Sequence, residues 1–241
     1  MRVVNRPYSV EEIASLIHRL PPVRFIPAAY FLADCGVITL VWTGFPTPVI
    51  DLQEKLGIQF PFLPPETRGS TWSKTTLAFR ASSEPLSLDE VVNLGDILDH
   101  ASEMILSGVR YLAVEEFSLI VYGDRALQHR FSKANLPVNQ EDSPQFEISP
   151  ASAAYVTTLL NASTEERLSG TTRTAHDLKY YTRPCHESTL AVDVDTWSHP
   201  SLDFLRSRID DQMPDRYHWI PTEARHITVR NLGPAESSDS N

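Results

Sequence analysis

Two of the expected strands combine a basic side chain with a threonine two residues later. Lys74 is followed by Thr76, and His226 is followed by Thr228. In a β-strand, side chains two residues apart lie on the same face, so each pair can point from one surface of a sheet. Hydroxyls donate hydrogen bonds to phosphate oxygens, and cations offset phosphate charge. If the two strands converge on one cleft, the four side chains form a site for a phosphate or another small anion.

The two basic residues differ in the proton chemistry that they can perform. An imidazole has a pKa near about 6.5 and exchanges protons at neutral pH, so His226 is a candidate general base or acid. A lysine with a pKa of about 10.4 is charged at pH 7 and accepts a proton only if burial lowers that pKa by several units. Lys74 is therefore a candidate catalytic residue as a phosphate-neutralising cation or as an acid.

Three further polar residues near the ends of expected strands could line the same cleft. They are Arg230, Tyr122 and Tyr181, which we expect to bind the anion. Asp193 and Asp195 have no evident third ligand, and no cysteine has the spacing of zinc ligands, so we expect neither a metal nor a cofactor. Glycine-rich nucleotide loops and nucleophile elbows are also missing from the sequence.

Apolar and β-branched runs predict the strands that position these residues, and capping and periodicity predict the helices. Strands are expected at 36–42, 72–79, 116–122, 188–194 and 226–230. Helices are expected from Ser9, over 49–56 with Gly57 as C-cap, over 87–105 with a Ser87/Glu90 capping box, and over 151–168 and 201–209. The mixture of elements predicts an α+β fold.

One order of elements occurs twice, which predicts an internal repeat. Each copy contains a strand, a turn with proline, a short helix, a loop with tryptophan and a strand with a basic residue and a threonine. We expect one structural domain with a helical lead-in at 1–23, a first lobe at 24–135, a connector with a helix at 136–170, a second lobe at 171–233 and a disordered tail at 234–241.

The second copy is similar to the repeat of a known family. Leu190-Ala-Val-Asp193, then Trp219-Ile-Pro, His226-Ile-Thr-Val and Leu232-Gly233 resemble the two-histidine phosphoesterases, which include RNA 2′,3′-cyclic phosphodiesterases and relatives described as RNA ligase or cyclic nucleotide phosphodiesterase. The resemblance covers roughly 45 residues. It implies a bilobal two-repeat fold with antiparallel sheets around a central cleft, in which catalysis needs no metal.

The resemblance also implies roles for individual residues. In the family one histidine acts as general base and the other as general acid, while the Ser/Thr pair holds the phosphate. Carried over to this chain, His226 is one acid/base, and Thr228 and Thr76 are the phosphate donors. Lys74 stands where the family has its first histidine, and this departure puts the family's hydrolysis mechanism in question.

The charge of the chain restricts its partners. Asp and Glu outnumber Lys and Arg by 31 to 21, giving a formal net charge of −10. Long-range repulsion disfavours a long nucleic acid, whereas a local basic pocket still suits a small phosphorylated or anionic substrate. With no signal peptide, no membrane-spanning run and only two cysteines, we expect a cytoplasmic protein without membrane contact.

Three functions fit these observations. The first is metal-independent hydrolysis of a small phosphodiester or 2′,3′-cyclic phosphate by a divergent phosphoesterase. A second is a non-hydrolytic enzyme in which Lys74 and His226 move protons on a small anionic metabolite. The third is a non-catalytic module that binds an anion or another protein, which the missing first histidine and the acidic charge favour.

Overall fold

The computed structural model describes residues 8–33, 35–66, 71–108, 110–162, 165–166, 168–169 and 176–235. It has an α+β fold whose strands pair antiparallel. Residues 236–241 of the expected tail and 1–7 of the expected lead-in lie outside the described residues. The described helices are α1 (Val10–Ile17), α2 (Thr47–Gln59), α3 (Leu88–Ser107), α4 (Pro150–Leu160), α6 (Leu178–Tyr181) and α7 (Pro200–Gln212).

Within these residues, one eight-stranded sheet has the order β2-β3-β4-β10-β8-β6-β7, and β9 pairs with β4. Its strands are β2 (Pro27–Leu32), β3 (Ile38–Trp42), β4 (Lys74–Arg80), β6 (Glu116–Tyr122), β7 (Arg130–Pro137), β8 (Glu187–Asp193), β9 (Tyr217–Trp219) and β10 (His226–Pro234). A small second sheet joins β1 (Val23–Phe25) to β5 (Leu112–Val114). The large sheet thus brings together β4 and β10, which are far apart in the sequence.

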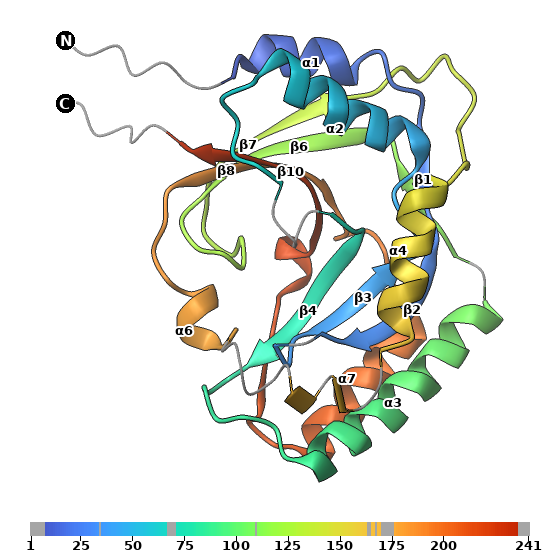
Figure 1. Ribbon diagram of the computed structural model, residues 1–241, viewed down its shortest axis with the longest axis vertical. Helices are drawn as coiled ribbons and strands as arrows, with labels where there is room; N and C mark the ends of the chain where they lie inside the picture. The colour runs from blue at the N-terminus through green and yellow to red at the C-terminus, as the bar shows by residue number, and fades with distance from the viewer. Residues whose placement is uncertain are drawn as a thin grey trace.

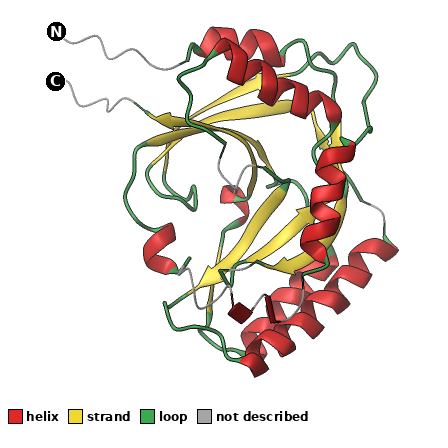
Figure 2. Cartoon of the chain, in the orientation of Figure 1, coloured by secondary structure: helices red, strands yellow, loops and turns green. Residues whose placement is uncertain are grey.

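Helices cover the large sheet at the two ends of the molecule (Figures 1 and 2). At one end α3 packs against β2 and α7, and at the other α1 contacts β7 while α2 contacts β10. The main hydrophobic core includes Ile17 of α1, Leu98 of α3 and Leu205 of α7, so it extends between the two ends. None of the described helices is both long and apolar enough to cross a bilayer.

The predicted capping box at the start of α3 is confirmed. The Ser87 hydroxyl accepts a hydrogen bond from the Glu90 amide, and the Glu90 carboxylate accepts one from the Ser87 amide at 2.7 Å. Replacing Ser87 by Ala is expected to lower the free energy of unfolding by about 1 kcal/mol, because the first turn of the helix loses a partner. Urea denaturation measures this change, and Ser83→Ala in the exposed preceding loop is the control. Equal stability of the two variants would contradict the capping role.

Several features differ from the sequence-based predictions. The helix expected over 151–168 is shorter, because α4 ends at Leu160 and the chain turns at Asn161. Gly57 is not a C-cap, because it keeps a helical conformation and α2 continues to Gln59. The strand β7 was not predicted, because it lies at the edge of the sheet and most of its side chains are exposed, which removes the apolar alternation.

Strand pairing crosses the expected boundary between the lobes. β6 and most of β7 fall within residues 24–135, yet β6 pairs with β8 from the expected second lobe. Conversely, β9 falls within residues 171–233 and pairs with β4. Each half of the sheet is therefore built from both halves of the sequence.

Candidate functional site

The two basic-x-Thr patterns meet at the contact between β4 and β10. Ile227 pairs with Thr75, the central residue of the other pattern. Because the strands are antiparallel, this register sets Lys74 near Thr228 and Thr76 near His226. The side chains of all four residues line one cavity of about 660 Å³. The convergence expected from the spacing of the two patterns is thus present in the structure.

The tautomer of His226 follows from one hydrogen bond. Its Nδ1 atom lies 2.8 Å from the carbonyl oxygen of Ala224. A carbonyl oxygen only accepts, so Nδ1 carries the proton and Nε2 of the neutral ring has a lone pair. Burial lowers the pKa of His226, and Arg130 lowers it further, against the opposing effects of Ala224 and Asp193. The ring is consequently a proton acceptor at neutral pH.

Asp193 pairs with His226 in the β8–β10 ladder and is the centre of a charged cluster. Its carboxylate accepts hydrogen bonds from Arg130 at 2.9 Å, from Lys133 at 2.8 Å and from Ser118. Burial raises the pKa of Asp193, but these three partners outweigh it and lower the pKa below its usual range. The cluster thereby stabilises the strand end that carries His226.

Replacing Asp193 by Asn is expected to lower the free energy of unfolding at pH 7 by about 2–3 kcal/mol, since two partly buried cations lose their carboxylate. The folded-state pKa is depressed, so the stabilisation exists above the unfolded-state value of 3.8 and disappears as the pH falls below it. Urea titrations at a series of pH values from 7 down to about 2 measure this dependence, because the loss continues until the pH passes the lower folded-state pKa. Exposed Asp195→Asn is the control. A difference between wild type and Asp193→Asn that stays constant with pH would contradict it.

On β4, aromatic side chains surround the two site residues. The Lys74 ammonium lies 4.5 Å from the centroid of the Trp72 ring, a cation–π contact that favours the charged form. The Thr76 and Tyr181 side chains line the cavity together. Tyr181 stacks on Phe79 with a ring separation of 4.3 Å, and burial raises its pKa well above the ordinary range. Lys74 therefore supplies a cation, and Tyr181 supplies a neutral hydroxyl.

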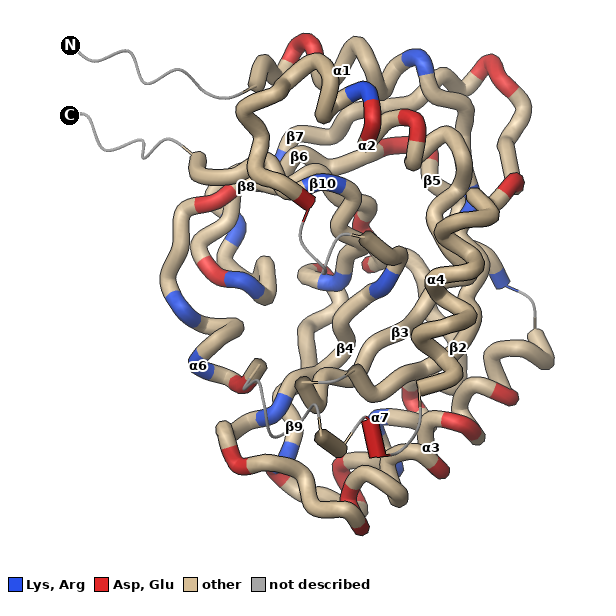
Figure 3. The backbone as a smooth tube through the Cα atoms, viewed as in Figure 1, with Lys and Arg blue, Asp and Glu red and all other residues tan. Residues whose placement is uncertain are grey.

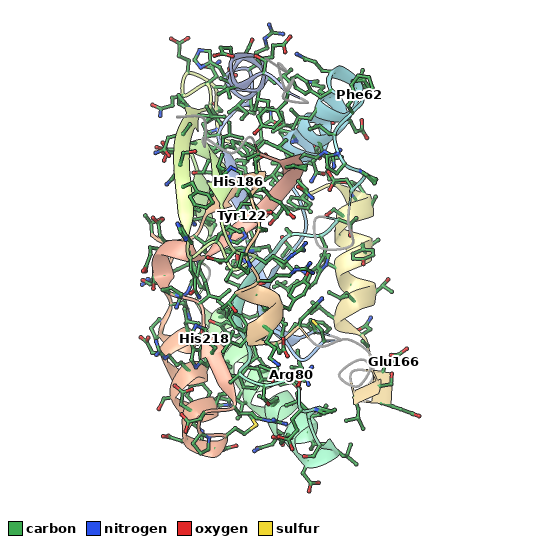
Figure 4. The ribbon with its side chains drawn as sticks, turned by 90° about the vertical axis from the view of Figure 1, so that its left-hand side faces the viewer. Phe62, Arg80, Tyr122, Glu166, His186 and His218 are labelled. Atoms are coloured by element: carbon green, nitrogen blue, oxygen red, sulfur yellow. The ribbon has the colours of Figure 1, made fainter. Side chains whose placement is uncertain are left out.

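Tyr122 takes part in a hydrogen-bonded chain on the β6 side of the cavity. Its hydroxyl donates to Glu187 at 3.0 Å, and the other carboxylate oxygen of Glu187 lies 3.6 Å from Arg125. Arg125 also donates to the Tyr180 hydroxyl at 3.1 Å. In Figure 4 the labelled Tyr122 lies in the upper half of the molecule and Arg80 in the lower half. Arg125, which contacts Glu187 and Tyr180 and lines the cavity, is a second cation of the site beside Lys74.

Arg230 is the one sequence-predicted site residue that does not line the cavity. It contacts Glu66 at 2.6 Å and donates to the Pro64 carbonyl at 2.8 Å. The register of β10 against β8 shifts between Thr228 and Arg230. Such a bulge reverses which face alternate residues occupy, so Arg230 turns away while Asn231 and Gly233 line the cavity.

Arg125 and His176 are two of the lining residues that were not predicted. Arg125 follows the Gly123-Asp124 turn that ends a predicted strand, so its place at a strand end was a usable signal. His176 precedes α6 in a segment without hydrophobic periodicity, and nothing in the sequence links it to the two patterns. Arg125 contacts Tyr180 and Glu187, and the residue after His176, Asp177, forms a bridge to Arg80 at the end of β4.

One wall of the cavity is apolar and aromatic. Phe31 and Trp72 contact each other edge to face, with ring centroids 6.4 Å apart. Tyr155 and Leu159 of α4 continue this wall. A ligand with a planar or apolar group next to an anionic group fits both the wall and the cations.

The charge of the cavity differs from that of the whole chain. Among the residues that the structure describes, the charged lining residues are Lys74, Arg125 and Glu187, two cations and one anion, in a chain of net charge −10. The acidic residues gather elsewhere, for example on α3, which has no Lys or Arg (Figure 3). The described part of the chain contains no group of three His, Cys, Asp or Glu side chains arranged like metal ligands.

Comparison with known proteins gives no relative for this chain. No family model matches it, and neither the curated proteins nor the solved structures contain a match.

Proposed function

We propose that the protein hydrolyses a small phosphodiester or 2′,3′-cyclic phosphate without a metal ion. One observation carries the proposal. The paired strands β4 and β10 place four side chains on the lining of one cavity: Lys74, Thr76, His226 and Thr228. Two hydroxyls and a cation hold the phosphate, and the imidazole beside them exchanges the proton that hydrolysis requires.

His226 acts as general base in this reaction. The Ala224 carbonyl holds the proton on Nδ1, so the Nε2 lone pair takes a proton from the attacking water. The water oxygen forms a bond to phosphorus, the phosphorus bond to one ribose oxygen breaks, and that oxygen leaves with a proton. Lys74 offsets the negative charge that builds up on the phosphate oxygens. The product is a phosphate monoester.

Features of the fold support the resemblance to the two-histidine phosphoesterases and its bilobal, two-repeat arrangement. Both basic-x-Thr patterns begin strands that pair antiparallel, and the residues between the basic residue and the threonine face each other. A group of helices lies at each end of the sheet. Lys74 stands where the family has its first histidine. On this proposal the lysine still binds the phosphate but does not act as general base.

The size and charge of the cavity favour a mononucleotide-sized substrate over a long nucleic acid. A volume of about 660 Å³ is within the usual range for small-molecule sites. The apolar wall offers a stacking surface for one ring, while the net charge of −10 repels a polyanion.

The test is a panel of 2′,3′-cyclic nucleotides, 3′,5′-cyclic nucleotides and a short RNA with a cyclic phosphate end, incubated with the protein in EDTA. Turnover of at least one 2′,3′-cyclic phosphate is expected. Binding of these ligands by thermal shift without any turnover would favour the non-catalytic module. Neither binding nor turnover, with stabilisation by a small carboxylate instead, would favour the Lys/His proton-transfer enzyme.

A further inference from the structure

Hydrolysis at this site needs two proton transfers, and His226 accounts for one of them. The second proton goes to the ribose oxygen that leaves phosphorus. A general acid works best when its pKa is near the working pH, and the pKa of an ordinary lysine, about 10.4, is far above it. Lys74 also lies against the Trp72 ring, which favours keeping its charge. The cavity therefore calls for a second group that titrates near neutrality.

We infer that His176, from the segment before α6, donates this second proton to the leaving oxygen. The inference rests on the proposed function and adds a catalytic residue that neither basic-x-Thr pattern contains. His176 lines the same cavity as Lys74, Thr76 and His226. It is half-buried and reaches the site from a part of the chain outside the two central strands.

The backbone on the C-terminal side of His176 is held firmly. The next residue, Asp177, is buried and forms an isolated bridge to Arg80 at the end of β4. Its carboxylate also accepts a hydrogen bond from the Tyr180 amide at 3.1 Å, which caps α6. His176 is thus tied to the strand that carries Lys74 and Thr76.

Two tyrosines position the imidazole ring. The ring centroid of His176 lies 4.1 Å from that of Tyr180 and 6.3 Å from that of Tyr181. Tyr181 lines the cavity together with Thr76. The two tyrosine rings therefore hold His176 on the lining of the cavity that also contains Thr76, one of the proposed phosphate donors.

The charges around His176 couple its protonation to the binding of an anion. Burial lowers the pKa of His176, as do Lys74 and Arg80 on β4 and Arg125 after β6, while Asp177 opposes them. An anion bound between Lys74 and Arg125 cancels part of their effect and raises that pKa. The substrate thereby favours the protonated ring that the reaction needs.

The protons balance over one turnover. His226 takes a proton from water, and His176 gives one to the ribose oxygen as the bond to phosphorus breaks. After the reaction the His226 ring is protonated and the His176 ring is neutral. Proton exchange with solvent after product release restores the starting protonation states. Lys74 stays charged throughout and stabilises the phosphate.

The decisive experiment is the pH dependence of kcat/KM for 2′,3′-cyclic AMP in EDTA, for wild type and His176→Gln. In wild type, kcat/KM is expected to fall as the pH rises above the His176 pKa, which lies below the ordinary value of 6.5. In His176→Gln, kcat is expected to be about 10²-fold lower with the alkaline decline absent. His100→Gln, on the exposed face of α3, is the control and should match wild type.

A second substrate separates proton donation from a structural role. A p-nitrophenyl phosphodiester of the same nucleoside releases a stable anion that needs no proton. With it, His176→Gln is expected to stay within about threefold of wild type, because general acid catalysis has nothing to supply. Equal losses on both substrates, or wild-type activity that persists to the lysine range near about pH 10, would overturn the inference while leaving hydrolysis intact. Turnover of neither substrate by wild type would overturn the proposed function itself, and the acid role with it.

Discussion

Replacing His226 by Gln is expected to lower kcat for 2′,3′-cyclic phosphate hydrolysis by about 10³-fold, within the usual range for loss of a general base. Glutamine keeps a hydrogen-bonding side chain of similar reach but cannot take a proton from water. Lys74, Thr76 and Thr228 remain to hold the phosphate, so KM should change by less than about threefold. Stopped assays at saturating substrate measure the loss.

The pH profile adds a second readout for the same variant. Burial lowers the pKa of His226, so the neutral, active ring persists to lower pH than an ordinary histidine allows. In wild type the acidic limb of kcat/KM should therefore lie below 6.5, and in His226→Gln it should vanish. Exposed His100→Gln again serves as control. An acidic limb that survives in His226→Gln would assign the base to another group.

Replacing Lys74 by Ala is expected to raise KM and the inhibition constant of inorganic phosphate by about 10- to 100-fold, the equivalent of roughly 1.5–3 kcal/mol. The variant removes a cation that offsets phosphate charge, and among the described lining residues Arg125 is the Lys or Arg that remains. It also removes a charge that lowers the pKa of His176, so the alkaline limb should move to higher pH.

Two comparisons sharpen the Lys74 experiment. Lys55→Ala on the exposed face of α2 removes the same charge far from the lining residues and should leave KM unchanged. Lys74→His restores a titrating group on β4, and increased hydrolysis by this variant would mean that the remaining cleft is intact. Unchanged phosphate affinity in Lys74→Ala would contradict the role of the ammonium as phosphate cation.

The sequence was sufficient to predict those site residues whose placement depends on the local periodicity of a strand. Alternation along a strand predicted that Lys74 shares a face with Thr76 and His226 with Thr228, and these four side chains line one cavity. The strand at Glu116–Tyr122 and the Ser87 cap of α3 were also predicted, since both follow from propensities and spacings within a few residues.

Features that depend on distant contacts were not predictable in this way. The bulge that turns Arg230 away arises from the pairing of β10 with β8, and a single residue of register shift reverses the facing of the side chains beyond it. His176 reaches the cavity because Asp177 bridges to Arg80 and because two tyrosines flank the ring. No local pattern encodes these contacts.

The most direct test of the account is ³¹P NMR of a 2′,3′-cyclic nucleotide incubated in EDTA with wild type and, in parallel, with His226→Gln. Wild type is expected to convert the cyclic phosphate resonance into that of a single monoester, while His226→Gln leaves it unchanged over the same time. Conversion at equal rates by both proteins, or by neither while both remain folded, would contradict the assignment of the β4–β10 cavity as a metal-independent phosphodiesterase centre.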